Sequence, residues 1–280
     1  MKRSLAIVLV VAACSSKKDD GASLADAGAD AGVRQGDAND WSCLGKVVLP
    51  ALPLVTAKVT FKISDATMHP STEATVRACP VREDEKCANG TATAPTDAKG
   101  EATFDVPADF DGYWEAIEPS ITDLHFVPFR QYRSPDFQWR TQWHFDELRI
   151  LSDTIDLKFD TTRGHVLILV RDCGFTGLPG KEIPPGTFSP PESLGGGVTL
   201  GLDPMPSGVV LAYIQAEPNL RIRTDLDETQ DGAGGGGFFN VPPGAYTVTG
   251  IRKSTGEKVG TQRIHVRADS FSLLLVVPTP

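Results

Sequence analysis

Apolar and polar residues alternate along much of this chain, and the alternation predicts short β-strands. In residues 57–63 every second residue is apolar and polar residues fill the positions between them. A period of two places the apolar side chains on one face of a strand. The run at 165–170 (HVLILV) is continuously apolar after its first residue and also predicts a strand. Together these patterns predict strands at 57–63, 75–79, 91–96, 101–106, 112–118, 165–170, 198–202, 209–214, 238–241, 245–252, 260–267 and 271–277.

Composition agrees with an all-β protein and limits the possible partners. The chain has 27 glycines and 21 prolines among 280 residues, so it is rich in turn formers, and strong amphipathic helices are hard to find. Short strands with Gly and Pro turns between them are typical of a sandwich rather than a βαβ fold. The formal net charge is −9, without a cluster of Lys and Arg. We therefore expect no nucleic-acid partner.

The two halves of the chain share a motif. Gly-x-x-x-Phe-x-Val-Pro occurs at 100–107 and again at 235–242. The segment FFNVPPGAYTVTG (238–250), which overlaps the second copy, resembles the core of carboxypeptidase regulatory-like domains, which are similar to transthyretin. The first copy, TDAKGEATFDVP (96–107), resembles it more weakly. The resemblance implies two antiparallel, transthyretin/Ig-like β-sandwich domains. It implies no peptidase activity, because this domain is an accessory to the carboxypeptidase.

The N-terminus carries a targeting signal. Lys2 and Arg3 precede nine uncharged residues at 5–13, which fit the apolar region of a secretory signal peptide and are too few to span a bilayer. The following junction, VAAC, resembles the bacterial lipobox. That resemblance implies cleavage before Cys14 and acylation of this cysteine, which anchors the chain in the lipid bilayer. The alternative is an ordinary buried cysteine after a signal peptide.

Composition changes along the chain suggest its division into segments. Ala-Asp-Ala-Gly occurs twice in succession at 25–32, within a stretch that has no aromatic residue before Trp41. Such low complexity predicts a disordered tether. The predicted segments are a signal peptide at 1–13, a lipidated disordered linker at 14–40, a first sandwich domain at 41–119, an irregular aromatic-rich connector at 120–162 and a second sandwich domain, the carboxypeptidase regulatory-like one, at 163–280.

The predicted connector is unusually aromatic. Ser152 is suited to cap a short helix over 153–159. The aromatic rings either cover the edge of a domain or form an exposed platform for a glycan or a peptide. These rings belong to Phe126, Phe129, Tyr132, Phe137, Trp139, Trp143 and Phe145.

Four cysteines remain after Cys14. An exported location permits disulfides, and four cysteines allow three pairings. We favour Cys79 with Cys87, because they flank a polar loop between two predicted strands. Cys43 and Cys173 then remain and would join the two halves of the chain. The alternative is that one or both pairs stay reduced. A zinc site has less support, since the chain has no C-x-x-C motif.

Few residues suggest chemistry. The chain lacks H-E-x-x-H, G-x-S-x-G and a phosphate-binding glycine loop followed by lysine. An acidic run at 225–232 contains Asp225, Asp227 and Asp231 and is followed by Gly232. Closely spaced carboxylates can bind calcium, although the spacing departs from an EF-hand and the closing Glu is missing. The alternative is a solvated acidic turn.

The sequence as a whole predicts a non-catalytic lipoprotein, anchored to the membrane through Cys14, that acts as a binding or scaffolding module of the cell envelope. Ser15 after the lipidated cysteine is compatible with sorting to the outer membrane, as the lipoprotein resemblance implies. The expected partner, besides lipid, is an envelope protein or glycan, and no cofactor is expected. The alternative is a carbohydrate-active enzyme with an unrecognised pair of carboxylates near the aromatic residues of 126–145.

Overall fold

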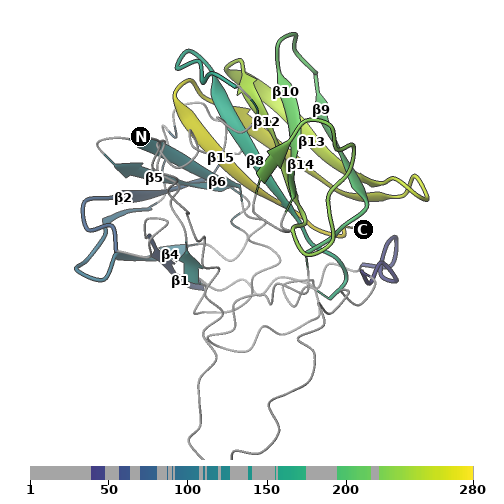
Figure 1. The fold of residues 1–280 in the computed structure, drawn as a ribbon. Coiled ribbons are helices and arrows are strands. Elements are labelled where there is room, and N and C mark those ends of the chain that lie inside the picture. The colour runs from purple at the N-terminus through teal and green to yellow at the C-terminus, as the bar shows by residue number, and fades with distance from the viewer. Residues whose placement is uncertain are drawn as a thin grey trace, which may run out of the picture.

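The described part of the computed structural model is built from β-strands and contains no helix (Figure 1). The structure describes residues 39–47, 57–63, 70–80, 87, 90, 92–106, 110, 112–118, 121–126, 138–140, 155, 157–174, 194–215 and 221–279. Within them, no helix is long and apolar enough to cross a membrane. The all-β prediction is confirmed. The strands are β1 (Ala57–Lys62), β2 (Thr75–Cys79), β3 (Ala92–Pro95), β4 (Glu101–Val106), β5 (Tyr113–Glu118), β6 (Ile121–Phe126), β7 (Gln138–Arg140), β8 (Gly164–Val170), β9 (Val198–Asp203), β10 (Val210–Gln215), β11 (Arg221–Arg223), β12 (Gly235–Val241), β13 (Gly244–Arg252), β14 (Lys258–Val266) and β15 (Ser270–Val276).

One large sheet joins the N-terminal and C-terminal strands. It has nine strands in the order β11-β10-β12-β8-β15-β6-β5-β2-β3. The last strand, β15, lies at its centre and pairs in parallel with β8 on one side and with β6 on the other. All other pairings in this sheet are antiparallel. In Figure 1 the yellow β15 lies beside the teal β8. Strands that are far apart in the sequence thus meet at the middle of one sheet.

Both faces of the central strands are buried. In β8, Val166 and Ile168 belong to one hydrophobic core and Leu167 belongs to another. In β15, Leu274 and Leu273 divide between the same two cores. Because parallel strands covered on both faces have no polar side, they read as continuous apolar runs. This explains why HVLILV lacks the alternation seen at 57–63.

Two three-stranded sheets cover the large sheet from opposite faces. The sheet β14-β13-β9 contributes residues to the core that contains Val166. The sheet β4-β1-β7 contributes residues to the core that contains Leu167. In this second core the rings of Phe61 and Phe104 lie 4.2 and 5.6 Å from the ring of Trp114, measured between centroids. The result is sandwich packing on both faces of a shared central sheet.

The domain boundaries predicted from the sequence stay a prediction. The large sheet takes strands from both predicted domains. The predicted connector at 120–162 contributes β6 to this sheet and β7 to the sheet β4-β1-β7. The short helix predicted over 153–159 does not form at 157–159, where the chain has no regular structure. The side chains of β6 and β7, including Phe126 and Trp139, and the other rings of the aromatic stretch lie outside the described residues.

Phe238 and Phe239 are both fully buried, although they are neighbours on β12. Neighbouring residues on a strand point to opposite faces, so a sandwich with a single core predicts that only one of the two rings faces inward. Alanine would then be better tolerated at the other position. The structure corrects this, because each ring enters a different core. The core around Phe239 is completed by the segment that precedes β8, through Ile155, Leu157 and Phe159. Alanine is therefore expected to be destabilising at either position.

Tyr246 closes the turn between β12 and β13, as its position after Pro-Pro-Gly leads one to expect. Its ring is buried and its hydroxyl donates a hydrogen bond to the carbonyl oxygen of Pro242 at 2.8 Å. Comparable tyrosine-to-backbone bonds fix corners in Greek-key sandwiches.

We expect Tyr246→Phe to lower the free energy of unfolding by about 1 kcal/mol, because the change removes this one bond and keeps the ring. Urea denaturation of the two proteins checks this. An unchanged denaturation midpoint would show that the bond contributes nothing to the corner.

Candidate functional site

A polar pocket of about 330 Å³ lies where the N-terminal segment meets the C-terminal strands. Four separate stretches of sequence form it. Its lining consists of Asn39, Trp41, Gly196, Gly197, Glu228, Thr229, Gln230, Asp231 and Arg252. The volume is at the lower end of the range for small-molecule pockets, which is about 300–1,000 Å³.

The segment that carries Asn39 and Trp41 is locked to the fold. Cys43 forms a disulfide with Cys173, which follows β8. The backbone N–H of Cys173 donates to the carbonyl oxygen of Asp40 at 2.7 Å. The N–H of Asp40 in turn donates to the buried carboxylate of Asp172 at 3.0 Å. One covalent bond and two hydrogen bonds thus fix this wall of the pocket before any ligand arrives.

Gly196, which lines the pocket, and its neighbour Gly195 form a floor where a side chain has no room. A Cβ on Gly195 would lie 2.7 Å from the Trp41 ring, and one on Gly196 would lie 1.9 Å from Oδ1 of Asp231. Thr229 fixes this floor to the acidic turn. Its hydroxyl donates to the carbonyl oxygen of Gly195 at 2.7 Å and accepts from the N–H of Val198 at 3.1 Å.

The walls of the pocket bring together groups of several kinds. The amide of Asn39 donates to Oδ1 of Asp231 at 2.6 Å. The guanidinium of Arg252 lies over the Trp41 ring, 5.5 Å from its centroid, which is a cation–π contact. Glu228 adds a half-buried carboxylate 4.0 Å from the ammonium of Lys253. Hydrogen-bond acceptors, donors and an indole ring therefore share one small space.

The three aspartates of the acidic turn each pair with a different side chain and do not converge on one point. Asp225 is paired with Arg223, Asp227 lies 2.7 Å from Nζ of Lys253, and Asp231 is bound by Asn39. The hydrogen bonds from Arg223 and Lys253 lower the pKa values of Asp225 and Asp227 respectively. Within the described ranges these three carboxylates form no common group of ligand atoms. Calcium binding at the turn stays a prediction from the sequence.

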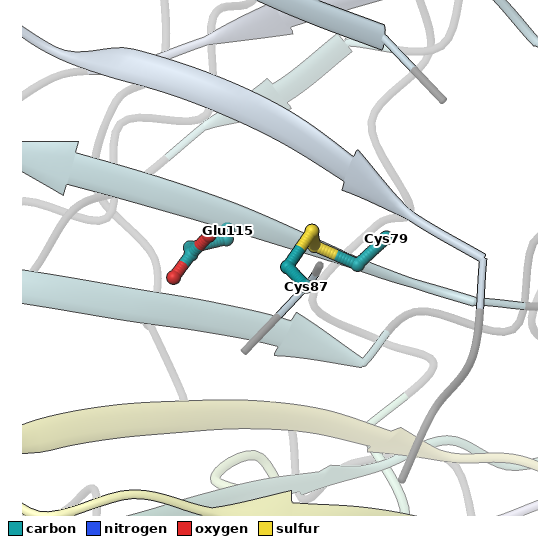
Figure 2. Close-up of side chains that lie close together, drawn as sticks. All are labelled: Cys79, Cys87 and Glu115. Carbon is teal, nitrogen blue, oxygen red and sulfur yellow. A yellow bond between two sulfur atoms is a disulfide. The ribbon is translucent and has the colours of Figure 1, made fainter. Parts of the chain in front are cut away.

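A second cluster, drawn in Figure 2, brings Cys79, Cys87 and Glu115 together. All three are buried, and their ligand-type atoms lie within 4.8 Å of one another. Cys79 and Cys87 are joined as a disulfide, so both disulfides have the pairing favoured from the sequence. Because a thiolate is the form of cysteine that binds metals, the oxidised pair offers no metal site.

Glu115 is held by two arginines from different parts of the chain. Its carboxylate pairs with Arg77 of β2, whose Nε donates to Oε2 at 2.6 Å, and with Arg267, which follows β14. Arg267 also donates to the hydroxyl of Tyr113. The side chain of Glu115 is only 2 % exposed. This network neutralises a buried charge and links β2 and β5 of the large sheet to the segment between β14 and β15.

His165 is a buried titratable group at the start of β8. Its ring lies 4.1 Å from that of Phe159, between centroids, and its Nδ1 accepts the backbone N–H of Asn240 at 3.3 Å. Asn240 in turn binds the segment before β8, through the carbonyl oxygen of Lys158 and the N–H of Asp160. Burial lowers the pKa of His165 to about 4, and the opposing effect of the Asp160 charge is smaller.

We expect the protein to lose stability as the pH falls from 6.5 towards 4. The unfolded chain binds a proton on this histidine near pH 6.5, whereas the folded protein binds it only near pH 4. The stabilisation is therefore complete above the unfolded pKa and is about 2 kcal/mol smaller at about pH 5. Urea denaturation at several pH values measures it. The variant His165→Gln should have a shallower pH dependence, and equal slopes would contradict this assignment.

The pocket is the part of the site that the sequence patterns did not reveal. Its residues span positions 39 to 252, and those at 228–231 are the part that belongs to a recognised pattern, the acidic run. The run of three glycines at 195–197 was the available signal, because consecutive glycines mark a place where other groups approach the backbone. Cys14 and most of the aromatic residues of 126–145 lie outside the described residues.

Comparisons with known proteins identify no family. No protein-family model and no curated protein sequence matches the chain. Among solved structures, a mutant of the shaft pilin spaA from Lactobacillus rhamnosus GG aligns with 14 % identity and a TM-score of 0.25, covering 81 % of this chain and 99 % of the pilin. The Bacillus anthracis TIE protein aligns with 12 % identity and a TM-score of 0.22, covering 81 % of this chain and 35 % of that protein. At such scores these similarities carry no argument about function.

Proposed function

We propose that this chain is a non-catalytic binding and scaffolding protein of the bacterial cell envelope, anchored in the outer membrane by lipid on Cys14. The observation that carries the proposal is the way the N-terminal segment joins the fold. The predicted tether at 14–40 leads directly into the segment that Cys43–Cys173 locks beside the polar pocket. A molecule bound in this pocket would therefore be held close to the anchored end of the chain.

The all-β frame supports a structural role. The Cys43–Cys173 disulfide ties the N-terminal segment to the residues after β8, and Cys79–Cys87 holds the end of β2. The buried Glu115 network links β2 and β5 to the segment after β14. We also propose that the C-terminal strands form a carboxypeptidase regulatory-like sandwich, on the strength of the FFNVPPGAYTVTG motif in β12 and β13. Such a module would present a ligand surface without acting on the ligand.

No described feature favours the alternative of a carbohydrate-active enzyme. That alternative needs two carboxylates that face each other beside the aromatic residues of 126–145. The two buried carboxylates of the described residues belong to Glu115 and Asp172. Glu115 is neutralised by two arginines, and Asp172 accepts the backbone N–H groups of Asp40 and Gly174.

Membrane fractionation of a Cys14→Ala variant tests the proposal. The wild-type protein should be found in the membrane fraction and take up labelled palmitate, whereas the variant should be soluble and unlabelled. Ser15→Ala is the matched control, because it leaves the lipidated residue in place. A Cys14→Ala variant that stays in the membrane fraction as firmly as the wild type would overturn the lipoprotein assignment.

A further inference from the structure

We propose that the pocket lined by Trp41, Gly196, Asp231 and Arg252 binds a saccharide unit of an envelope glycan. The proposal deepens the binding role proposed above and names the class of its ligand. It rests on three observations: the hydrogen-bonding and aromatic groups that line the pocket, the bonds that hold these groups in place, and the other classes of ligand that would interact unfavourably with them.

The lining suits a ligand with many hydroxyl groups. Asp231 and Glu228 supply acceptors, Asn39 and Arg252 supply donors, and Trp41 supplies both a ring surface and an N–H group. A sugar ring carries hydroxyls that both donate and accept, and C–H groups that contact aromatic surfaces. Arg252 keeps donor capacity for a ligand. In the described part of the chain its guanidinium lies over the Trp41 ring and has two long polar contacts, 3.4 Å to Ser254 and 3.9 Å to Glu257.

Other classes of ligand fit less well. The carboxylates of Glu228 and Asp231 would repel a phosphate or another anion. The guanidinium of Arg252 would repel a metal cation, and the described residues place no group of three ligand atoms here. An apolar ligand would leave the carboxylates and the guanidinium without solvent or partners, which is costly. An uncharged polar molecule remains, and the volume of about 330 Å³ can hold one sugar ring.

The pocket is also preformed. The disulfide of Cys43 holds Trp41 in place, and the hydroxyl of Thr229 holds the acidic turn against the glycine floor. A ligand therefore does not have to order the loops that bind it, which lowers the entropic cost of association. Asn39 lies at the C-terminal end of the predicted tether. A glycan bound here would thus be attached close to the membrane anchor.

Titration of the purified mature chain with sugars tests the proposal. The probes are glucose, galactose, N-acetylglucosamine and its trisaccharide, each followed by tryptophan fluorescence and by calorimetry. We expect at least one probe to bind saturably with a Kd below about 10 mM. If no probe gives saturable binding up to about 50 mM, the proposal is overturned.

Two pairs of variants assign the binding to this pocket. Arg252→Gln should weaken binding at least tenfold, and Arg221→Gln, an exposed arginine on β11, should leave it unchanged. Gly196→Ala should also weaken binding, because its methyl group lies where the Asp231 carboxylate sits, whereas Gly201→Ala meets nothing closer than 3.8 Å. Circular dichroism confirms that each variant is folded. Equal binding by folded Arg252→Gln and the wild type would overturn the proposal.

Failure of this proposal differs from failure of the anchoring proposal. Sugar binding is measured in solution and does not depend on lipid, while membrane fractionation does not depend on the pocket. If the protein is in the membrane fraction but binds no sugar, the saccharide proposal is wrong and the anchored scaffolding role still stands. If the protein binds a sugar but is not in the membrane fraction, the lipoprotein proposal is wrong and saccharide binding in the pocket still stands.

Discussion

Removal of the Cys43–Cys173 disulfide is expected to lower the free energy of unfolding by about 5 kcal/mol, roughly twice the loss from removal of Cys79–Cys87. The two bonds close loops of very different length, with sequence separations of 130 and 8 residues. In the chain-entropy account a disulfide stabilises a protein by restricting its unfolded state, and the restriction grows with the logarithm of the loop length. The shorter bond is then expected to contribute about 2.5 kcal/mol.

Urea denaturation of two double variants measures the difference. One replaces Cys43 and Cys173 with alanine, and the other replaces Cys79 and Cys87. Because both pairs are at least partly buried in hydrophobic cores, alanine introduces a similar packing defect in each case. Equal losses, or a larger loss for the short loop, would show that local packing rather than chain entropy determines the contribution of these bonds.

The Cys43–Cys173 disulfide, which closes the longer loop, also determines which residues can be stretched by a force applied through the tether. A pull between the N-terminal segment and the C-terminus passes from Cys43 to Cys173, so the residues between them lie in a closed covalent loop. Stretching single oxidised molecules should release only the chain after Cys173. Addition of a reductant should lengthen the fully extended chain by roughly 450 Å. The same extension with and without reductant would contradict the closed loop.

The sequence predicted most strands because their pattern is local. Alternation at 57–63 and the apolar run at 165–170 correspond to β1 and β8. Three strands were missed for local reasons as well. In β6 (ITDLHF), polar and apolar residues do not alternate strictly, and β7 and β11 have only three residues each. Short strands such as these are fixed by their neighbours in the sheet.

The arrangement of the strands depended on information that periodicity does not hold. The parallel pairing of β15 with β8 and β6 brings together segments about 100 to 150 residues apart, and nothing in an apolar run specifies its partner. The candidate site shows the same contrast. The disulfides were predictable because cysteines have few possible partners, whereas no local pattern connects Trp41 with Arg252, which lies on β13.

The buried Glu115 network leads to the second large expected effect. Arg267→Met should lower the free energy of unfolding by about 3–5 kcal/mol, because it leaves a buried carboxylate with one arginine instead of two. It also removes the hydrogen bond to Tyr113 and the cation–π contact with that ring, whose centroid lies 5.6 Å from the guanidinium carbon. The methionine keeps the apolar stem of the side chain, so the loss reports on the charge.

An exposed ion pair provides the matched control. Asp225, the partner of Arg223, is 63 % exposed, so Arg223→Met should cost less than about 1 kcal/mol. In a double-mutant cycle, adding Glu115→Met to Arg267→Met should recover part of the loss, because the uncompensated charge is then absent. If Arg267→Met costs no more than Arg223→Met, Glu115 is not a buried charge that depends on its partners. Of Arg267→Met, Arg223→Met and the double variant, Arg267→Met alone should be the least stable. The reason is that an under-compensated carboxylate in the core costs more free energy than an apolar side chain at the same position.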